Sequence, residues 1–266
     1  MPPATSEATL RKELCDAGRV LYERGLIAPV DGNFSARVGD RYIVCTPSGA
    51  HKGELRPDDL VKLTVDGRVV TPGGKPSSEL RMHLAIYRFR PDVRCIVHAH
   101  PPCAVGLTVA GVSLERPVVP EILFAIGSVP NVPYSSPTTD EVPDSIRPLL
   151  AHTDAFMLSR HGSVILCDTP REGVIKTEII EHTAKIYLAA RIAGAATPLP
   201  PEEISKLLGL ASAARGDSPA QAGTDRRVVP SPGSPERRPA SGGDSPSEES
   251  ALVEAITRAV LSRMTK

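Results

Sequence analysis

Apolar residues recur along the first three quarters of the chain with two different periods, which predicts a domain of both helices and strands. The first predicted helix ends near Gly25, and its apolar face consists of Leu10, Leu14, Ala17 and Leu21. A second helix is predicted over residues 78–89, where Pro91 ends it. A third begins at Pro170, a favoured first helical position for proline, and runs to about Gly194.

Short apolar runs between these helices predict five strands. They occupy residues 41–45, 60–65, 95–98, 155–159 and 163–167. Asp66-Gly67 is a hairpin signal that joins the second run to residues 68–70. Because strand and helix patterns are interleaved, we expect a mixed α/β protein with a central sheet and helices on its faces.

The composition is unusual in its 27 prolines, nine Phe and Tyr residues and no Trp. All the aromatic residues lie between Tyr22 and Tyr187, whereas 19 of the 40 residues at 211–250 are Pro, Gly or Ser. Such a stretch buries too little apolar surface to offset the entropy of ordering, which predicts a disordered linker. We therefore expect a folded domain at 1–210, a linker at 211–247 and an amphipathic helix at 248–266.

Charge and hydropathy exclude several classes of protein. Lys and Arg total 31 and so do Asp and Glu, so no net charge recruits nucleic acid or an anionic membrane. No apolar stretch approaches the roughly 20 residues of a membrane helix, and the N-terminus lacks the apolar core of a secretion signal. The five cysteines are odd in number and show no CxxC spacing, which is typical of reduced thiols in a cytoplasmic protein.

A His-Ala-His sequence ends the predicted strand at 95–98. Residues two apart on a strand point to the same face, so His98 and His100 can converge on one ion. Glu79 begins the preceding helix, and His161 follows the strand at 155–159, which would complete a set of three imidazoles and a carboxylate. Such a set suits zinc. The alternative for the histidine pair alone is two ordinary polar residues at a strand end that bind no metal.

Three small turns carry hydroxyl groups and glycines, at residues 31–35, 46–49 and 77–78. Backbone amides and serine hydroxyls in such turns can hold a phosphate, and a helix N-terminus adds partial positive charge. Each turn taken alone is equally typical of an ordinary loop or helix cap.

Several separated segments resemble the class II aldolase/adducin family, and in particular its L-fuculose-1-phosphate aldolases. The similar segments are residues 32–35, 46–49, 76–87, 90–93, 97–100 and 158–162, in the same order as in the family. The resemblance covers about residues 8–195. It implies a three-layer α/β/α fold with a mixed, mainly antiparallel sheet, assembled as a homotetramer with active sites at subunit interfaces.

The resemblance also implies roles for individual residues. His98, His100 and His161 would ligate Zn²⁺, and Glu79 would be the acid/base and a further metal ligand when no substrate is bound. An acid/base carboxylate that works at pH 7 is expected to have its pKa raised by partial burial. The residues implied to hold the substrate phosphate are Gly32, Asn33, Ser48, Gly49, Ser77 and Ser78.

The chain departs from the family in its tyrosines. Family aldolases use one tyrosine after the histidine pair and another near the C-terminus of a neighbouring subunit. Here residues 120–127 contain no tyrosine and no aromatic residue follows Tyr187. Glu121 is our candidate for the missing proton donor.

The resemblance implies cleavage of L-fuculose 1-phosphate, or a relative such as L-rhamnulose 1-phosphate, to dihydroxyacetone phosphate and L-lactaldehyde. The alternatives on the same scaffold are a dehydratase for methylthioribulose 1-phosphate and a 4-epimerase for a pentulose phosphate. The epimerases carry Asp where this chain has Glu79, which argues against that activity. A non-enzymatic, adducin-like module would not need the three histidines.

Residues 248–266 recover helical periodicity, with acidic residues at the start and basic residues toward the end. A tethered amphipathic helix of this kind resembles the peptides that direct enzymes into bacterial microcompartments. It implies shell proteins as partners and the lumen of a microcompartment as the location. Docking on the enzyme's own surface and a coiled coil between subunits are the alternatives.

Overall fold

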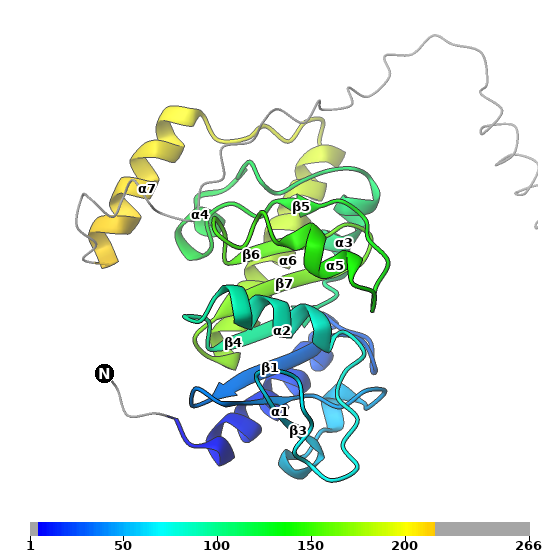
Figure 1. Cartoon of the computed structure of the whole chain (residues 1–266). Helices are drawn as coiled ribbons and strands as arrows, with labels where there is room; N and C mark the ends of the chain where they lie inside the picture. The colour runs from blue at the N-terminus through cyan, green and yellow to red at the C-terminus, as the bar shows by residue number, and fades with distance from the viewer. Residues whose placement is uncertain (1–4, 216–266) are drawn as a thin grey trace, which may run out of the picture. The chain divides into compact units, whose positions relative to one another are not determined.

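The computed structural model describes residues 5–215 (Figure 1). Its α-helices are α1 (Glu7–Glu23), α2 (Leu80–Phe89), α3 (Pro102–Val109), α4 (Pro120–Ala125), α5 (Glu141–Ile146), α6 (Pro170–Ile192) and α7 (Pro201–Arg215). Its strands are β1 (Asn33–Val38), β2 (Tyr42–Cys45), β3 (Val61–Thr64), β4 (Cys95–Ala99), β5 (Asn131–Val132), β6 (Ala155–Leu158) and β7 (Gly162–Cys167). Two 3₁₀ turns lie at Lys52–Glu54 and Pro57–Asp59.

The seven strands form one sheet in the order β3-β2-β1-β4-β7-β6-β5. All neighbouring strands are antiparallel except β5 and β6, so the predicted mixed, mainly antiparallel sheet is confirmed. The central strand β4 pairs with β1 on one side, where Asn33 lies opposite His98. On its other side it pairs with β7, where Ala99 lies opposite Ser163.

Helices cover both faces of the sheet, which confirms the predicted layers. One apolar core joins the sheet to α1, α3, α4 and α6, and the other joins it to α2 and α5. In Figure 1, α2 lies in front of the sheet and α6 lies behind it. Strand β4 alternates between the cores: Val97 belongs to the first and Ile96 to the second, which puts His98 on the α2 side.

The long helices begin and end where the sequence predicts. The Ser6 side chain accepts a hydrogen bond from the amide of Thr9 at the start of α1, and Gly25, at φ +67°, follows its end. Pro170 is the first residue of α6, and the hydroxyl of Thr169 caps that helix. All five cysteines are free, as expected. No helix within residues 5–215 is long and apolar enough to cross a membrane.

Some elements differ from the predictions. Residues 31–35, expected as a turn, run into β1, and the strand expected at 68–70 is reduced to a single bridge between Leu63 and Val69. Helix α7 continues to Arg215, past the domain boundary expected at 210. The helix expected at 248–266 and nearly all of the linker lie outside the described residues.

Candidate metal centre

Three histidines from two parts of the chain meet at one end of β4. His98 is in the strand, His100 follows it, and His161 lies in the tight turn between β6 and β7. Because β4 and β7 pair side by side, the turn that begins β7 reaches the end of β4. The nitrogens that these three residues offer all lie within 4.8 Å of one another, which is the spacing of ligands around a single ion.

The residue after His161 must be small for this approach to occur. A Cβ atom on Gly162 would lie 2.5 Å from the Ala99 carbonyl oxygen and 2.7 Å from the His100 ring. Both distances are shorter than non-bonded atoms tolerate. Glycine at this position therefore lets the β6–β7 turn come close enough to deliver the third imidazole.

Hydrogen bonds fix which nitrogen of His98 faces the site. Its Nδ1 lies 2.8 Å from the carbonyl oxygen of Ser163, which can only accept, so Nδ1 donates this hydrogen bond and Nε2 is the nitrogen that faces the site. Nε2 of His98 is 3.0 Å from Nε2 of His100, and Asp31 lies 3.5 Å from Nδ1 of His100. Ligand histidines are commonly oriented through their second nitrogen in this way, so the donors fit a divalent cation.

Burial keeps the two outer imidazoles neutral. It is the largest influence on both, and with the neighbouring histidines it lowers the pKa of His100 to about 3 and that of His161 to about 4. Neutral imidazole is the form that binds a metal. These residues are therefore ready to act as ligands at pH 7.

Glu79 points into the same cluster from the N-terminus of α2. Its carboxylate oxygens lie 3.3 Å from Nε2 of His98 and 3.2 Å from Nε2 of His161. The amide of Asn33 donates to Glu79 Oε2 at 2.6 Å. Burial alone would raise the pKa of Glu79, but His98, His161 and Asn33 outweigh it, and the net pKa is well below its usual range. The raised pKa that we expected is wrong, and the group is a carboxylate at neutral pH.

Comparison with known proteins agrees with this site. Residues 12–188 match the model of the class II aldolase and adducin N-terminal domain. The chain belongs to the class II aldolase and adducin family. A 3-oxo-tetronate 4-phosphate decarboxylase from Escherichia coli O6:H1 is 33% identical over 187 residues, which cover 69% of this chain and 88% of the relative.

Other members of the family are similarly close. An L-fuculose phosphate aldolase from Methanococcus vannielii is 33% identical over 175 residues, or 66% of this chain and 93% of the aldolase. The crystal structure of YgbL from Klebsiella pneumoniae aligns with a TM-score of 0.71 at 31% identity, over 76% of this chain and 99% of YgbL. The family therefore includes metal-dependent lyases that act on sugar phosphates by more than one reaction, both decarboxylation and aldol cleavage.

Two of the turns expected to hold phosphate lie side by side in this class II aldolase domain. The amide of Ser77 donates to the carbonyl oxygen of Thr46 at 3.2 Å, and the amide of Ser48 donates to the carbonyl oxygen of Lys75 at 3.0 Å. The hydroxyl of Ser77 accepts from the amide of Glu79, which links this turn to the metal centre. Ser48 and Ser77 thus use their amides within the protein.

The third turn, residues 31–35, is connected to the turn at 77–78 through the carboxylate of Glu79. Asn33 begins β1 and donates to Glu79, and Gly32 before it has φ +67°. Gly49 also has a left-handed backbone, with φ +70°, a conformation that glycine adopts without strain. Ser78 immediately precedes Glu79 and is exposed. The turns at 31–35 and 77–78 therefore both contact Glu79, and the turn at 46–49 is joined to the second of them.

A buried lysine that was not predicted from the sequence lies beside the site. Lys52 is only 2% exposed, and its ammonium group donates to the carbonyl oxygens of Val30 and Ala50, at 3.1 and 2.9 Å. Burial lowers the pKa of Lys52. These bonds tie down the loop that carries Asp31 to His100. No hydrophobic pattern distinguishes this lysine from a surface one.

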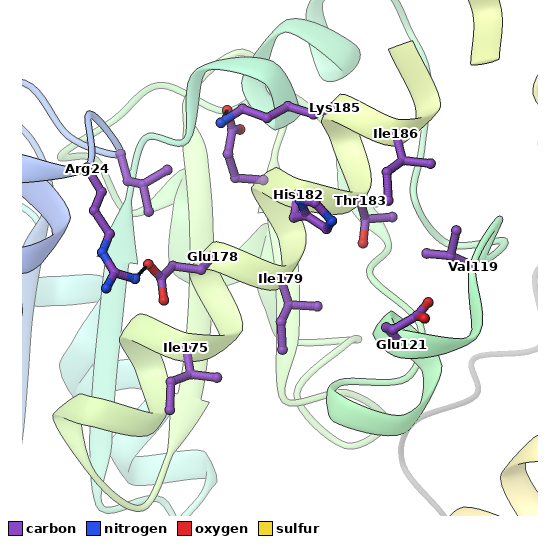
Figure 2. A pocket seen from close by; sticks show the side chains of 12 residues that line it. Arg24, Val119, Glu121, Ile175, Glu178, Ile179, His182, Thr183, Lys185 and Ile186 are labelled. Carbon is purple, nitrogen blue, oxygen red and sulfur yellow. Dashed lines mark ion pairs between the residues drawn. The ribbon is translucent and has the colours of Figure 1, made fainter. Parts of the chain in front are cut away.

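Glu121 lies apart from the histidines, in the first turn of α4. It is exposed and lines a pocket of about 740 Å³, formed with α6 and the end of α1 (Figure 2). An ion pair between Arg24 and Glu178 lies at one side of this pocket. The pocket touches the metal centre only indirectly, through Leu26, whose carbonyl oxygen accepts from the amide of His100.

Proposed function

We propose that this protein is a zinc-dependent lyase that generates the enediolate of dihydroxyacetone phosphate and protonates it at carbon. The observation that carries the proposal is the position of the Glu79 carboxylate, 3.2–3.3 Å from two of three clustered imidazoles. Three histidines with an open position are a typical catalytic zinc site. When bound, the ion supplies Lewis-acid stabilisation of the negative charge that develops on the substrate oxygens.

Glu79 handles the proton in this proposal. Its pKa lies below the usual range, so it begins as a carboxylate, and in the decarboxylation it passes a proton taken from solvent water to the carbon that CO₂ has left. Asn33 holds one carboxylate oxygen by its 2.6 Å hydrogen bond, which fixes the direction of transfer. Gly32, Asn33, Ser48, Gly49, Ser77 and Ser78 bind the phosphate and orient the reacting bond.

Two leaving groups would produce the same enediolate. A 3-oxo acid with phosphate on C4 loses CO₂ to leave the three-carbon ketone phosphate that aldol cleavage of a ketose 1-phosphate also leaves. Decarboxylation requires one proton at carbon and no base for a departing hydroxyl, whereas aldol cleavage requires both. We favour decarboxylation of a 3-oxo-tetronate 4-phosphate, which is the activity named for a relative 33% identical to this chain.

The missing tyrosines support this choice. Between residues 112 and 145 the only tyrosine is Tyr134, whose exposed fraction is 61%, and none follows Tyr187 in the sequence. Cleavage of L-fuculose 1-phosphate, or of L-rhamnulose 1-phosphate, to L-lactaldehyde is the second candidate. It would need Glu121 of a neighbouring subunit in a homotetramer to take over the hydroxyl proton.

The test is a product assay with the zinc-loaded protein and both substrates. Dihydroxyacetone phosphate should form from the 3-oxo acid with one CO₂ per turnover, and Glu79→Gln should slow its formation by about 10²- to 10⁴-fold. Lactaldehyde from L-fuculose 1-phosphate at a higher kcat/KM would establish the second candidate instead. The absence of dihydroxyacetone phosphate from both substrates would refute the proposal.

We also propose that residues 248–266 direct the enzyme into a microcompartment by binding shell proteins. The support is the amphipathic pattern of the sequence and the Pro/Gly/Ser-rich tether before it. A fluorescent reporter fused to residues 245–266 should form foci in a host that makes the shell. Diffuse fluorescence there would contradict the proposal.

A further inference from the structure

The side of β1 that faces α2 is polar, although it lies inside the apolar core on that side of the sheet. Every second residue of the strand contributes a hydrogen bond to a residue of α2 or to Glu79, its N-cap, and these helix partners are spaced four apart. The contacts are Asn33 Nδ2 to Glu79 Oε2 at 2.6 Å, Ser35 Oγ with His83 Nδ1 at 2.6 Å and with Tyr87 Oη at 2.9 Å, and Arg37 Nη2 to the Tyr87 carbonyl oxygen at 2.5 Å.

The repeats of the two elements explain why these pairs can form in sequence. Four residues of an α-helix rise about 6.0 Å, and two residues of a β-strand rise about 6.7 Å. The strand residues and their helix partners follow one another in the same direction along the chain. Consecutive turns of α2 therefore meet consecutive residues on one face of β1. The last pair is strengthened because the Arg37 guanidinium lies 4.6 Å from the centre of the Tyr87 ring.

The hydrogen-bonded row consists of Asn33, Ser35 and Arg37 on β1 with Glu79, His83 and Tyr87 on the helix side. A contribution to stability does not by itself explain this row. Ser35, His83 and Tyr87 are each at most 2% exposed, and Nε2 of His83 has no hydrogen-bond partner among the described residues. Buried polar groups contribute little net stability, and apolar groups of similar shape can replace them at little cost. Met82 and Ile86 already anchor the helix to the apolar core. The row therefore requires a reason other than packing.

Apolar packing alone defines the position of a helix weakly, because side chains without polar atoms can repack at several rotations. A slip of one residue would turn α2 by about 100° and move it by about 1.5 Å. Glu79 is the N-cap of this helix, so any rotation would carry its carboxylate away from the histidines. Hydrogen bonds are directional and penalise such a slip.

We propose that Ser35, His83 and Tyr87 are positioning residues for Glu79. They fix the rotation and axial position of α2 on β1, and thereby place the carboxylate between the imidazoles of the metal centre. The kinetic part of this inference rests on the proposed function, whereas its structural part does not.

The test replaces the row by apolar groups of similar shape in the zinc-loaded full chain, with Ser35→Ala, His83→Phe and Tyr87→Phe combined. Ser128→Ala is the matched control, because its buried hydroxyl bonds only a backbone carbonyl remote from α2. Tyr87→Phe alone serves as a milder variant, and His83→Asn as a conservative one that keeps a polar atom near the position of Nδ1. Crystal structures of the variants, their melting temperatures and kcat and KM are measured.

We expect the triple variant to melt within a few degrees of the wild type and to show Glu79 displaced by about 1 Å or in several positions. Its kcat should fall about 10- to 100-fold with KM nearly unchanged, because misplacement of that size slows chemistry while the phosphate turns stay intact. His83→Asn should recover part of kcat, and Tyr87→Phe should show an intermediate loss.

A triple variant with Glu79 in its original position would overturn the inference whatever its activity. So would a kcat equal to that of Ser128→Ala. If the triple variant does not fold, the same two measurements on Tyr87→Phe decide the matter. A wild-type protein inactive on both substrates would refute the proposed function alone, since the crystallographic result does not depend on turnover.

Discussion

Replacing Gly162 by alanine should weaken metal binding through steric overlap alone. The backbone of Gly162 does not have a positive φ, so alanine introduces no conformational strain there. The added methyl group would lie 2.5 Å from the Ala99 carbonyl oxygen, 2.7 Å from the His100 ring and 2.9 Å from the His98 ring. All three neighbours belong to the segment that carries the first two ligands.

The size of the effect follows from these distances. Ordinary contacts begin near 3.4 Å, so the β6–β7 turn and the end of β4 must separate by about 0.5–0.9 Å. Overpacking of this kind typically costs about 1–3 kcal/mol of stability. The same displacement pulls His161 away from His98 and His100, and we expect Zn²⁺ affinity to fall by about 10- to 100-fold, as with other changes that misorient ligands.

Competition with a chromophoric chelator measures the Zn²⁺ affinity, and thermal unfolding measures stability. Gly106→Ala is the matched control, because a Cβ atom on that exposed residue of α3 meets nothing within 4 Å. It should leave zinc affinity unchanged and raise stability by about 0.5–1 kcal/mol. Equal zinc affinity in the two variants would refute the steric argument.

Three further predictions concern the centre and its surroundings. Glu79→Gln should lower kcat by about 10²- to 10⁴-fold while zinc content, measured by metal analysis, stays at one per chain; loss of the metal would instead make Glu79 an essential ligand. Ser77→Ala should raise KM more than it lowers kcat, and an unchanged KM would remove Ser77 from the phosphate site. Burial lowers the pKa of His83 to about 3 from 6.5, so its contribution to stability is present above pH 6.5 and is lost as the pH falls toward 3. His83→Asn should therefore reduce the drop in unfolding free energy between pH 6.5 and pH 4 by about 3 kcal/mol in denaturant titrations, and an unchanged drop would contradict the assigned protonation.

Local patterns in the sequence were sufficient to predict most of the helices and strands around the site. The apolar repeats predicted α1, α2 and α6, because a helix or strand must bury one face whatever its partner is. Local patterns also predicted that His98 and His100 lie on one side of a strand end and that Glu79 lies at the start of a helix. Strand β1 was missed because the Asp-Gly-Asn sequence at its start looked like a turn, although Phe34, Ala36 and Val38 do alternate with polar residues.

Contacts between distant segments decided the chemistry of the centre. The sequence placed His161 after a predicted strand, as the candidate third ligand, but only the pairing of β4 with β7 brings it to the histidine pair. The lowered pKa of Glu79 could not be foreseen, because it depends on imidazoles 19 and 82 positions later in the chain. The row that joins β1 to α2 was equally invisible, since His83 and Tyr87 show only helical spacing until Ser35 is placed against them. Periodicity is set by neighbours in the chain, whereas register and electrostatics are set by neighbours in space.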